Sequence, residues 1–392
     1  MITTAGETRA SFHEVSAQVW DALVIGAGPA GALAARELAR QGRSVLLVDR
    51  ARFPRPKVCG CCINRGALAT LNAVGLQGLA QSCGAVPLQR VRLATDGRQA
   101  VLPLVGGVAL SRSRFDAALV EAAVQAGARV IPETLAQLGP CQPHARQVRL
   151  RHRDQETTAS ASLVIAANGL GGNLLAAETP SQAKPGSRLG AGTILQEAPA
   201  AYEPGTVFMA CGVGGYAGLV RLEDGRLDVA AALDPVYVAA AGGLGRAAEG
   251  ILHQARLPTI PSLTESRWRG TPLLSRRLQT PSGRGVLAIG DAAGYVEPFT
   301  GEGIAWALAS AAAVPSFWAL PDGERGRAWN HWYRRQIARR QWLCRLVAAA
   351  LRRPRLVRTA VTLLAHAPLF AAPALRYLQR SRLKTLGHSG LG

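Results

Sequence analysis

The chain has 392 residues, 48% of them hydrophobic, and a formal net charge of +20 at pH 7. This length and composition exclude a disordered chain and predict two packed lobes with a sizeable core. Seven cysteines without a framework spacing argue against a disulfide scaffold and favour a reducing compartment, so we expect a cytoplasmic protein. Residues 1–18 are polar and irregular, which predicts a flexible arm without a secretory signal.

The first ordered element is a strand, a glycine-rich turn, a helix and a second strand within Asp21–Arg50. The spacing G-x-G-x-x-G allows a tight turn, close approach of backbone N–H groups to a pyrophosphate, and close packing of helix on strand. Asp49 ends the second strand, where its carboxylate can accept hydrogen bonds from a ribose, and Arg50 follows it. The segment therefore predicts a dinucleotide site formed by Gly26, Gly28, Pro29, Ala30 and Gly31 together with Asp49 and Arg50.

The next segment, Phe53–Leu76, should run along the bound cofactor and contains Cys59, Cys61 and Cys62. A zinc site needs about four ligands, and no second cysteine pair exists, so we predict no metal. A disulfide between the adjacent Cys61 and Cys62 would be strained. Two interpretations stay open: buried or cofactor-lining thiols, or a catalytic thiol at Cys59 activated by the nearby Lys57.

Two further elements complete the chain order before the C-terminus. Gly212–Pro235 alternates in hydrophobicity around Glu223-Asp224-Gly225, which predicts a hairpin. Tyr216 in its first strand is a candidate for either the substrate pocket or the core of the sheet. Gly285–Ile304 then gives a short apolar strand, Gly290–Asp291, and glycines before an apolar helix at Ala305–Ala313.

These elements resemble the single-Rossmann FAD-dependent oxidoreductase superfamily, which includes aromatic hydroxylases and geranylgeranyl reductase-like flavoproteins. The resemblance implies FAD as the cofactor, with Asp291 on the ribityl chain and a helix N-terminus near the pyrimidine edge of the flavin. It also implies a contact from Arg112, which stands three residues before Phe115-Asp116 at the start of a helix, while Arg114 faces solvent. The implied FAD contacts are Lys57, Gly60, Arg112, Gly290, Asp291, Gly301, Gly303 and Ile304.

Three local matches bear on the subfamily. Residues 54–60 resemble the Pro-x-x-Lys-x-Cys-Gly segment of the geranylgeranyl reductase-like flavoproteins. Gly215 and Tyr216 match the reductase pattern Gly-Tyr-x-Trp-x-x-Pro, but Gly218 replaces its tryptophan, and the halogenase pattern Trp-x-Trp-x-x-Pro is absent. Asn168 stands where the hydroxylases have an acid, which weakens the hydroxylase interpretation.

The C-terminal region carries most of the charge. Residues 325–392 contain fourteen arginines, one lysine and no acidic residue. An apolar stripe runs through it, formed by Trp329, Trp332, Ile337, Trp342, Leu346, Val347 and Leu351. Binding to anionic lipid and a helical cap docked on the two lobes are both open, whereas no motif supports nucleic-acid binding. The segment 356–375 is too interrupted by proline and charge to predict a spanning helix.

The expected fold is α/β, with a Rossmann-like parallel sheet, an antiparallel-sheet substrate domain and a C-terminal helical cap. We expect an FAD-binding domain at 19–188, with a substrate-side insertion near 75–100, and its second part at 276–320. The parallel sheet would come from residues 19–74, 101–172 and 276–320. The substrate domain spans 189–275, and a basic helical region spans 321–392.

The expected function is that of an FAD-dependent oxidoreductase acting on a small apolar substrate, prenyl- or polyketide-like, that is free, carrier-bound or membrane-derived. Flavin hydride transfer would reduce or form a C=C bond. The alternatives are an aromatic monooxygenase and a flavin-binding interaction protein. No second G-x-G-x-x-G is present, so electrons would come from transient NAD(P)H or another carrier. The basic C-terminus would contact the inner membrane face peripherally.

Overall fold

The computed structural model describes residues 12, 15–172, 174–175, 178–179, 181–183, 185–297 and 299–367. Most of the predicted flexible arm and the last 25 residues of the basic region lie outside the described residues. Pro298, beside the second glycine-rich element, lies outside them as well.

The first sheet is the predicted parallel sheet. Of its central strands, Val45–Val48 is fully buried and Val19–Ile25 is buried from Ala22 onward, and both have mostly apolar sequences. In spatial order the strands are β17 (Ser282–Gly283), β18 (Val286–Ala288), β9 (Gln155–Ala166), β1 (Val19–Ile25), β2 (Val45–Val48) and β6 (Arg129–Ile131). Strands β18, β9, β1, β2 and β6 pair in parallel. The hairpin β7 (Thr134–Cys141) and β8 (Arg146–His152) extends β9.

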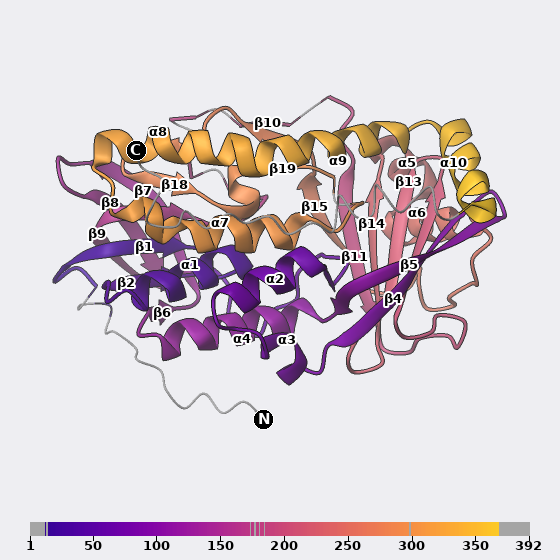
Figure 1. Cartoon of the computed structure of the whole chain (residues 1–392), viewed down its shortest axis with the longest axis horizontal. Helices are drawn as coiled ribbons and strands as arrows, with labels where there is room; N and C mark the ends of the chain where they lie inside the picture. The colour runs from indigo at the N-terminus through magenta and orange to yellow at the C-terminus, as the bar shows by residue number, and fades with distance from the viewer. Residues whose placement is uncertain are drawn as a thin grey trace.

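Helices from distant parts of the chain pack on this sheet or on one another beside it (Figure 1). They are α1 (Pro29–Ala39), α2 (Arg65–Ala73), α3 (Leu79–Ser82), α4 (Arg112–Gln125) and α7 (Gly303–Trp318). Helix α1 packs on both α4 and α7. The two helices that follow the glycine-rich turns, α1 and α7, therefore touch each other. Helix α7 continues well past the predicted end at Ala313 despite an internal proline at Pro315.

The second sheet has eight strands and lies at the other end of the molecule (Figure 1). In spatial order they are β15 (Arg269–Leu273), β11 (Leu189–Leu195), β14 (Leu227–Leu233), β13 (Gly215–Arg221), β12 (Thr206–Gly212), β4 (Val86–Thr95), β5 (Arg98–Ala109) and β3 (Cys62–Ile63). All pairs are antiparallel except β12 with β4. The predicted hairpin at Glu223-Asp224-Gly225 joins β13 to β14.

The boundary of the insertion differs from the sequence-based expectation. We expected the parallel-sheet segment to resume at Val101, but β5 stays in the second sheet as far as Ala109. Strands β4 and β5 pair along their length, and this continuous ladder keeps the backbone of residues 98–109 hydrogen-bonded to the second sheet. Three of its eight strands, β3, β4 and β5, therefore come from the segment before α4.

The remaining elements join or cover the two sheets. A small sheet pairs β10 (Ser181–Ala183), β16 (Arg276–Leu278) and β19 (Gly294–Tyr295), next to the 3₁₀ turn η1 (Gly290–Ala293). Helices α5 (Pro235–Ala241) and α6 (Leu244–Gln254) cover the outer face of the second sheet. At the C-terminus, α8 (Asp322–Tyr333), the π-helical turn η2 (Arg334–Ala338) and α9 (Arg339–Ala350) form one rod along the molecule, and α10 (Pro354–His366) turns onto β4 and β5 (Figure 1).

The basic region thus contains a docked cap, with its apolar stripe divided between core and surface. Trp329 and Trp332 stack on each other with ring centroids 5.0 Å apart and are buried against Phe317. By contrast, Trp342 is 60% exposed and Leu346 is 46% exposed on α9. None of the helices in the described part of the chain has the length and hydropathy needed to span a bilayer.

Candidate FAD site

The glycine turn before α1 is built to leave room for a ligand. Gly26 has φ +106°, and a Cβ there would overlap the Ala167 carbonyl. A Cβ on Gly31 would overlap the Gly26 carbonyl oxygen, so only glycine lets the turn close. Gly28 caps α1 without any side-chain hydrogen bond, which leaves the first N–H groups of the helix available to an anion.

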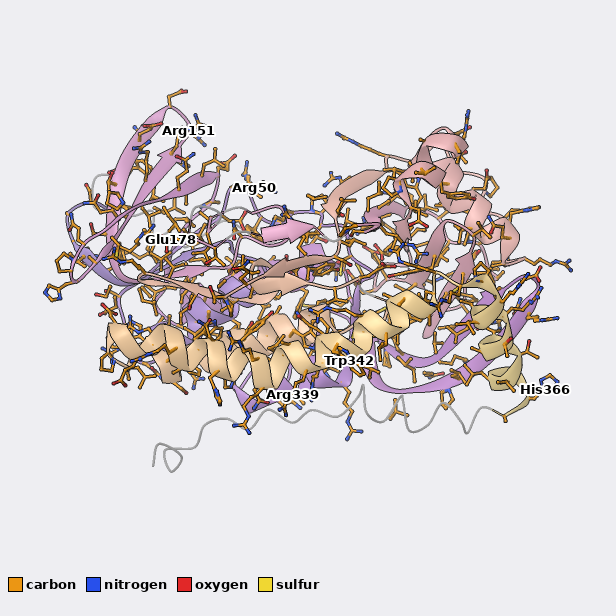
Figure 2. The ribbon with its side chains drawn as sticks, turned by 90° about the horizontal axis from the view of Figure 1, so that it is seen from above. Arg50, Arg151, Glu178, Arg339, Trp342 and His366 are labelled. Carbon is orange, nitrogen blue, oxygen red and sulfur yellow. The ribbon has the colours of Figure 1, made fainter. Side chains whose placement is uncertain are left out.

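Asp49 holds the end of β2 against this turn. Its Oδ2 accepts a hydrogen bond from Ala27 N at 2.7 Å, and its Oδ1 accepts one from Ala51 N at 2.8 Å. The side chain is 7% exposed, at the position predicted for ribose binding. Arg50, its neighbour, is exposed on the surface (Figure 2).

Arg112 reaches the same turn from the start of α4. Its guanidinium pairs with the fully buried Asp116 through two bonds, Nε to Oδ1 at 2.7 Å and Nη2 to Oδ2 at 2.8 Å. A Cβ built on Gly28 would lie 3.9 Å from Arg112 Nη2 and 3.5 Å from Arg55 Nη2. Two guanidinium groups therefore flank the predicted pyrophosphate position, which suits a ligand with two negative phosphates. Arg114 is exposed, as predicted from its place in the helix.

The second glycine-rich element packs against the first. A Cβ built on Gly290 would lie 2.9 Å from the Ala30 Cβ, and the Gly290 N–H donates to Ser310 Oγ at 3.0 Å. Burial raises the pKa of Asp291 to about 6, an effect that Arg112 and Lys57 oppose. Burial likewise lowers the pKa of Lys57, with Arg112 and Arg55 adding to the effect. Predicted contacts from four separate segments thus interact within one polar cluster.

Not every predicted contact is explained by packing within the chain. A Cβ built on Gly60 or Gly301 meets no atom within 4 Å, and one on Gly303 approaches only Tyr295 at 3.9 Å. Gly301 has φ +67°, which favours glycine for conformational reasons. Ile304 is buried in the first turn of α7. The roles of Gly60, Gly301, Gly303 and Ile304 toward FAD remain predictions.

The three neighbouring cysteines occupy different surroundings. Cys59 is half-buried, and its sulphur interacts with the Cys61 thiol and with Arg112. The hydrogen bond from Cys61 lowers the pKa of Cys59 to about 6, assisted by Arg112 and opposed by burial. Burial raises the pKa of Cys62 strongly, so that thiol stays protonated. All three thiols are free, and the described residues contain no group of three or more side chains suited to a metal ion.

Tyr216, the other candidate, is buried on the inner face of the second sheet. It is 4% exposed, packs edge-on against Phe299 at 5.0 Å, and its hydroxyl has no hydrogen-bond partner among the described residues. Asp228, two residues into the next strand, is 3% exposed and has an unpartnered Oδ2. Burial raises the pKa of both groups well above their ordinary values. Sequence reasoning missed Asp228, because a single acid in a hairpin gives no signal of burial.

A buried ion pair also escaped prediction. Arg188, 2% exposed, donates to Glu297 Oε1 at 2.9 Å, and Glu297 is itself 2% exposed. Arg352, from the end of the basic rod, reaches Glu297 Oε2 at 3.3 Å. Glu297, on the cofactor-side loop, therefore links Arg188 beside the second sheet to Arg352 in the helical cap. No local sequence pattern links residues so far apart.

Comparison with known proteins shows which proteins share this arrangement of residues. A family model described as an FAD-binding domain matches residues 19–206. Menaquinone reductase from Mycobacterium tuberculosis is 52% identical over 56 residues, 14% of each chain, and digeranylgeranylglycerophospholipid reductase from Methanosarcina mazei is 34% identical over 158 residues, 38% of each chain. Residues 19–206 thus form an FAD-binding domain, and the chain resembles the single-Rossmann FAD-dependent oxidoreductases. These matches span well under two thirds of the length of either relative.

A solved structure extends the likeness of this flavoprotein to its whole fold. A geranylgeranyl bacteriochlorophyll reductase-like protein from Thermoplasma acidophilum superposes with a TM-score of 0.75 at 18% identity, covering 92% of this chain and 96% of that one. The cofactor of the flavoprotein is FAD, and its residues fit that group. The uncapped start of α1, the paired guanidinium groups and Asp49 offer complementary contacts for a diphosphate and a ribose.

Glu302 at the start of α7 gives the flavoprotein a pH-dependent stability. Burial raises its pKa from 4.5 to about 7, and its Oε1 accepts from Asn64 Nδ2 at 3.0 Å. The native state therefore binds this proton more tightly than the unfolded state, and stability from it is present below pH 4.5 and lost as pH rises through 7. We expect Glu302→Gln to raise stability at pH 8 by at most about 3 kcal/mol.

The measurement is the Tm of wild type and Glu302→Gln between pH 4.5 and pH 8. The gain from the variant should shrink toward zero at the acid end. Glu324→Gln, at an exposed position of α8, is the control and should leave the Tm unchanged. An equal effect of Glu302→Gln on the Tm at every pH would show that the pKa of Glu302 is not raised in the folded protein.

Proposed function

We propose that this flavoprotein transfers hydride between FAD and a C=C bond of an apolar, prenyl- or polyketide-like substrate, by reduction or by dehydrogenation. The observation that carries the proposal is the position of the Lys57–Cys59 loop. Val58 lies against the inner face of the second sheet, where a Cβ built on Gly192 would be 3.2 Å from Val58 Cγ1. The same loop brings Lys57 and Cys59 to Arg112 and Asp291. The cofactor-side cluster therefore adjoins that sheet face directly.

The inner sheet face suits an apolar ligand. Gly192, Ala230 and Gly218 stand side by side on three paired strands and form a row of small residues, over which Val58 and Met209 pack. Around it lie buried apolar residues of a cluster that α10 closes from outside: Val91, Leu102, Met209, Cys211, Tyr216, Ala232, Val357 and Val361. Apolar walls of this kind bind hydrocarbon and exclude water from a hydride transfer.

Bound FAD supplies the hydride chemistry, and the chain must supply or accept a proton at the neighbouring carbon. Tyr216 and Asp228 border the small-residue row, and burial raises the pKa of each well above its ordinary value, which favours the protonated form. Cys59 is the third candidate, as a thiolate beside Arg112. The two curated relatives support the substrate class, since their names indicate a polyprenyl quinone and a geranylgeranyl lipid.

The experiment mixes anaerobically reduced holoenzyme with menaquinone and, separately, with the same quinone carrying a fully saturated side chain. Reoxidation of the flavin by menaquinone alone, with a product heavier by two hydrogens, supports C=C reduction. Equal reoxidation by both compounds indicates reduction of the quinone ring and overturns the proposal. Oxygen uptake that an aromatic substrate stimulates would establish a monooxygenase, and a flavin that no acceptor reoxidises would indicate an interaction protein. The same apparatus tests NADPH as the electron donor.

We further propose that α9 and α10 bring the enzyme to an anionic membrane surface, from which an apolar substrate can enter. Arg339 and Trp342 lie along the outer edge of α9 (Figure 2), and Leu346, Leu356 and Leu363 are 46%, 48% and 59% exposed. Exposed apolar side chains among arginines match the chemistry of a headgroup layer with acyl chains beneath it.

The prediction is measured by cosedimentation with vesicles of phosphatidylglycerol and phosphatidylcholine. Trp342→Ala should weaken binding about tenfold, since burial of one large side chain contributes a few kcal/mol at most. Leu135→Ala is the matched control, because Leu135 is 44% exposed but lies on β7, at the end of the molecule away from α9 and α10 (Figure 1). Binding that does not respond to Trp342→Ala, or that is as strong to pure phosphatidylcholine, would refute membrane docking through this face.

A further inference from the structure

The segment Cys59-Gly60-Cys61 places two thiols in contact beside the cofactor cluster. Cys61 is fully buried in an apolar cluster against which Cys59 packs, and the interaction with the Cys61 thiol and backbone N–H lowers the pKa of Cys59. Cys61 has φ +49°, a conformation uncommon for a residue with a side chain, and its carbonyl accepts from Leu110 N at 2.9 Å. Cys62, next in the chain, is paired with Ala109 in the second sheet. The loop is therefore fixed on its C-terminal side with the two sulphurs together.

The start of α4 activates this pair. The Arg112 backbone N–H interacts with the Cys61 sulphur, and the Arg112 guanidinium interacts with Cys59. Positive charge and the N-terminus of a helix are the surroundings that turn a thiol into a reactive thiolate. Arg112 also lies beside the predicted pyrophosphate position at Gly28, which puts the pair next to the FAD path. Asp228, which is buried on β14, interacts with the Cys61 side chain.

We propose that Cys59 and Cys61 form a redox-active dithiol that exchanges two electrons with the bound FAD. In the oxidising direction the Cys59 thiolate and the Cys61 thiol form an S–S bond and lose one proton and two electrons. Oxidised FAD takes up both electrons and the proton, so charge and atoms balance. The reverse step returns the Cys59 thiolate and the Cys61 thiol. The proposal depends on FAD binding but not on the identity of the substrate.

The pair differs from the vicinal pair that sequence reasoning rejected. One residue separates Cys59 from Cys61, so closing the bond does not require the strained ring of adjacent cysteines. Neither Arg112 nor a hydrogen bond from another thiol acts on Cys62 in the described structure. Burial, together with the charges of Asp228 and Cys59, raises the pKa of Cys62. Cys62→Ser is thus a matched control one position away from the dithiol.

The first test is an anaerobic reductive titration of air-equilibrated holoenzyme with dithionite. Wild type and Cys62→Ser should consume about four electrons per FAD, because the disulfide and the flavin each take two. Cys59→Ser and Cys61→Ser should consume about two. The flavin absorbance spectrum before the titration shows that each variant is folded and holds FAD.

The second test identifies the bond without using activity. Free thiols are alkylated in the holoenzyme before and after dithionite treatment, and the peptide that contains residues 59–62 is analysed by mass spectrometry. We expect a Cys59–Cys61 disulfide before reduction and three alkylated cysteines after it. Wild type that takes up only two electrons per FAD and alkylates at both Cys59 and Cys61 in air would overturn the dithiol while leaving the proposed function intact. A chain without FAD would instead refute the proposed function.

Discussion

Gly31→Ala should abolish FAD retention and destabilise the first lobe. The new Cβ would overlap the Gly26 carbonyl oxygen, which is backbone and has no rotamer to escape into. Helix α1 must then move away from β1, and this opens the turn that faces the pyrophosphate. Overpacking of this kind costs about 3 kcal/mol. The measurement is the ratio of flavin to protein absorbance after purification, together with the Tm.

Gly78→Ala is the control for this substitution. Gly78 has φ −94°, and a Cβ there meets no atom within 4 Å, so alanine fits both the conformation and the space. It should retain FAD at the wild-type ratio. A Gly31→Ala protein with full flavin content and an unchanged Tm would show that α1 does not pack as closely as the structure requires.

Arg188→Met should lower the free energy of unfolding by about 3 kcal/mol. The substitution leaves Glu297 buried with one guanidinium fewer, and Arg352, which is 35% exposed, is its other partner in the structure. A buried carboxylate without full compensation is costly, because it has lost its water and not regained equivalent contacts. Urea denaturation followed by tryptophan fluorescence measures the loss.

Two variants make this prediction specific. Glu297→Gln combined with Arg188→Met removes both charges and should recover part of the stability, since the penalty comes from the unpaired charge. Arg358→Met breaks the exposed pair with Asp96 and should change stability by less than about 1 kcal/mol. If the single and double variants are equally unstable, packing of the arginine stem rather than its charge is the cause.

The sequence was sufficient for the elements whose pattern is local. The turn from Gly26 to Gly31, the acid at the end of β2 and the hairpin between β13 and β14 each follow from residues within a short window, and the structure contains them at the expected positions. Superfamily, fold class and cofactor could be predicted because two such windows occur in a characteristic order. The comparisons confirm all three.

The parts that sequence reasoning missed depend on long-range contacts. Strand β5 alternates in the same way whichever sheet it joins, so its place beside β4 follows from pairing and not from its residues. The Arg188–Glu297 pair joins positions 109 residues apart, and a single arginine in a polar stretch does not predict burial. Asp228 and Cys61 likewise meet only because β3 and β14 are brought into one sheet.

The order of strands in the parallel sheet has a consequence for synthesis on the ribosome. Strand β9 lies between β1, near the start of the chain, and β18, near residue 286. The sheet and the α7 side of the cofactor cluster are therefore incomplete until about three quarters of the chain has left the exit tunnel. Until then, the edge of β9 that β18 will cover is exposed, and contacts of such long sequence separation form slowly. FAD capture should therefore come late in synthesis, after α7 has left the exit tunnel, and the nascent protein should depend on chaperones until then.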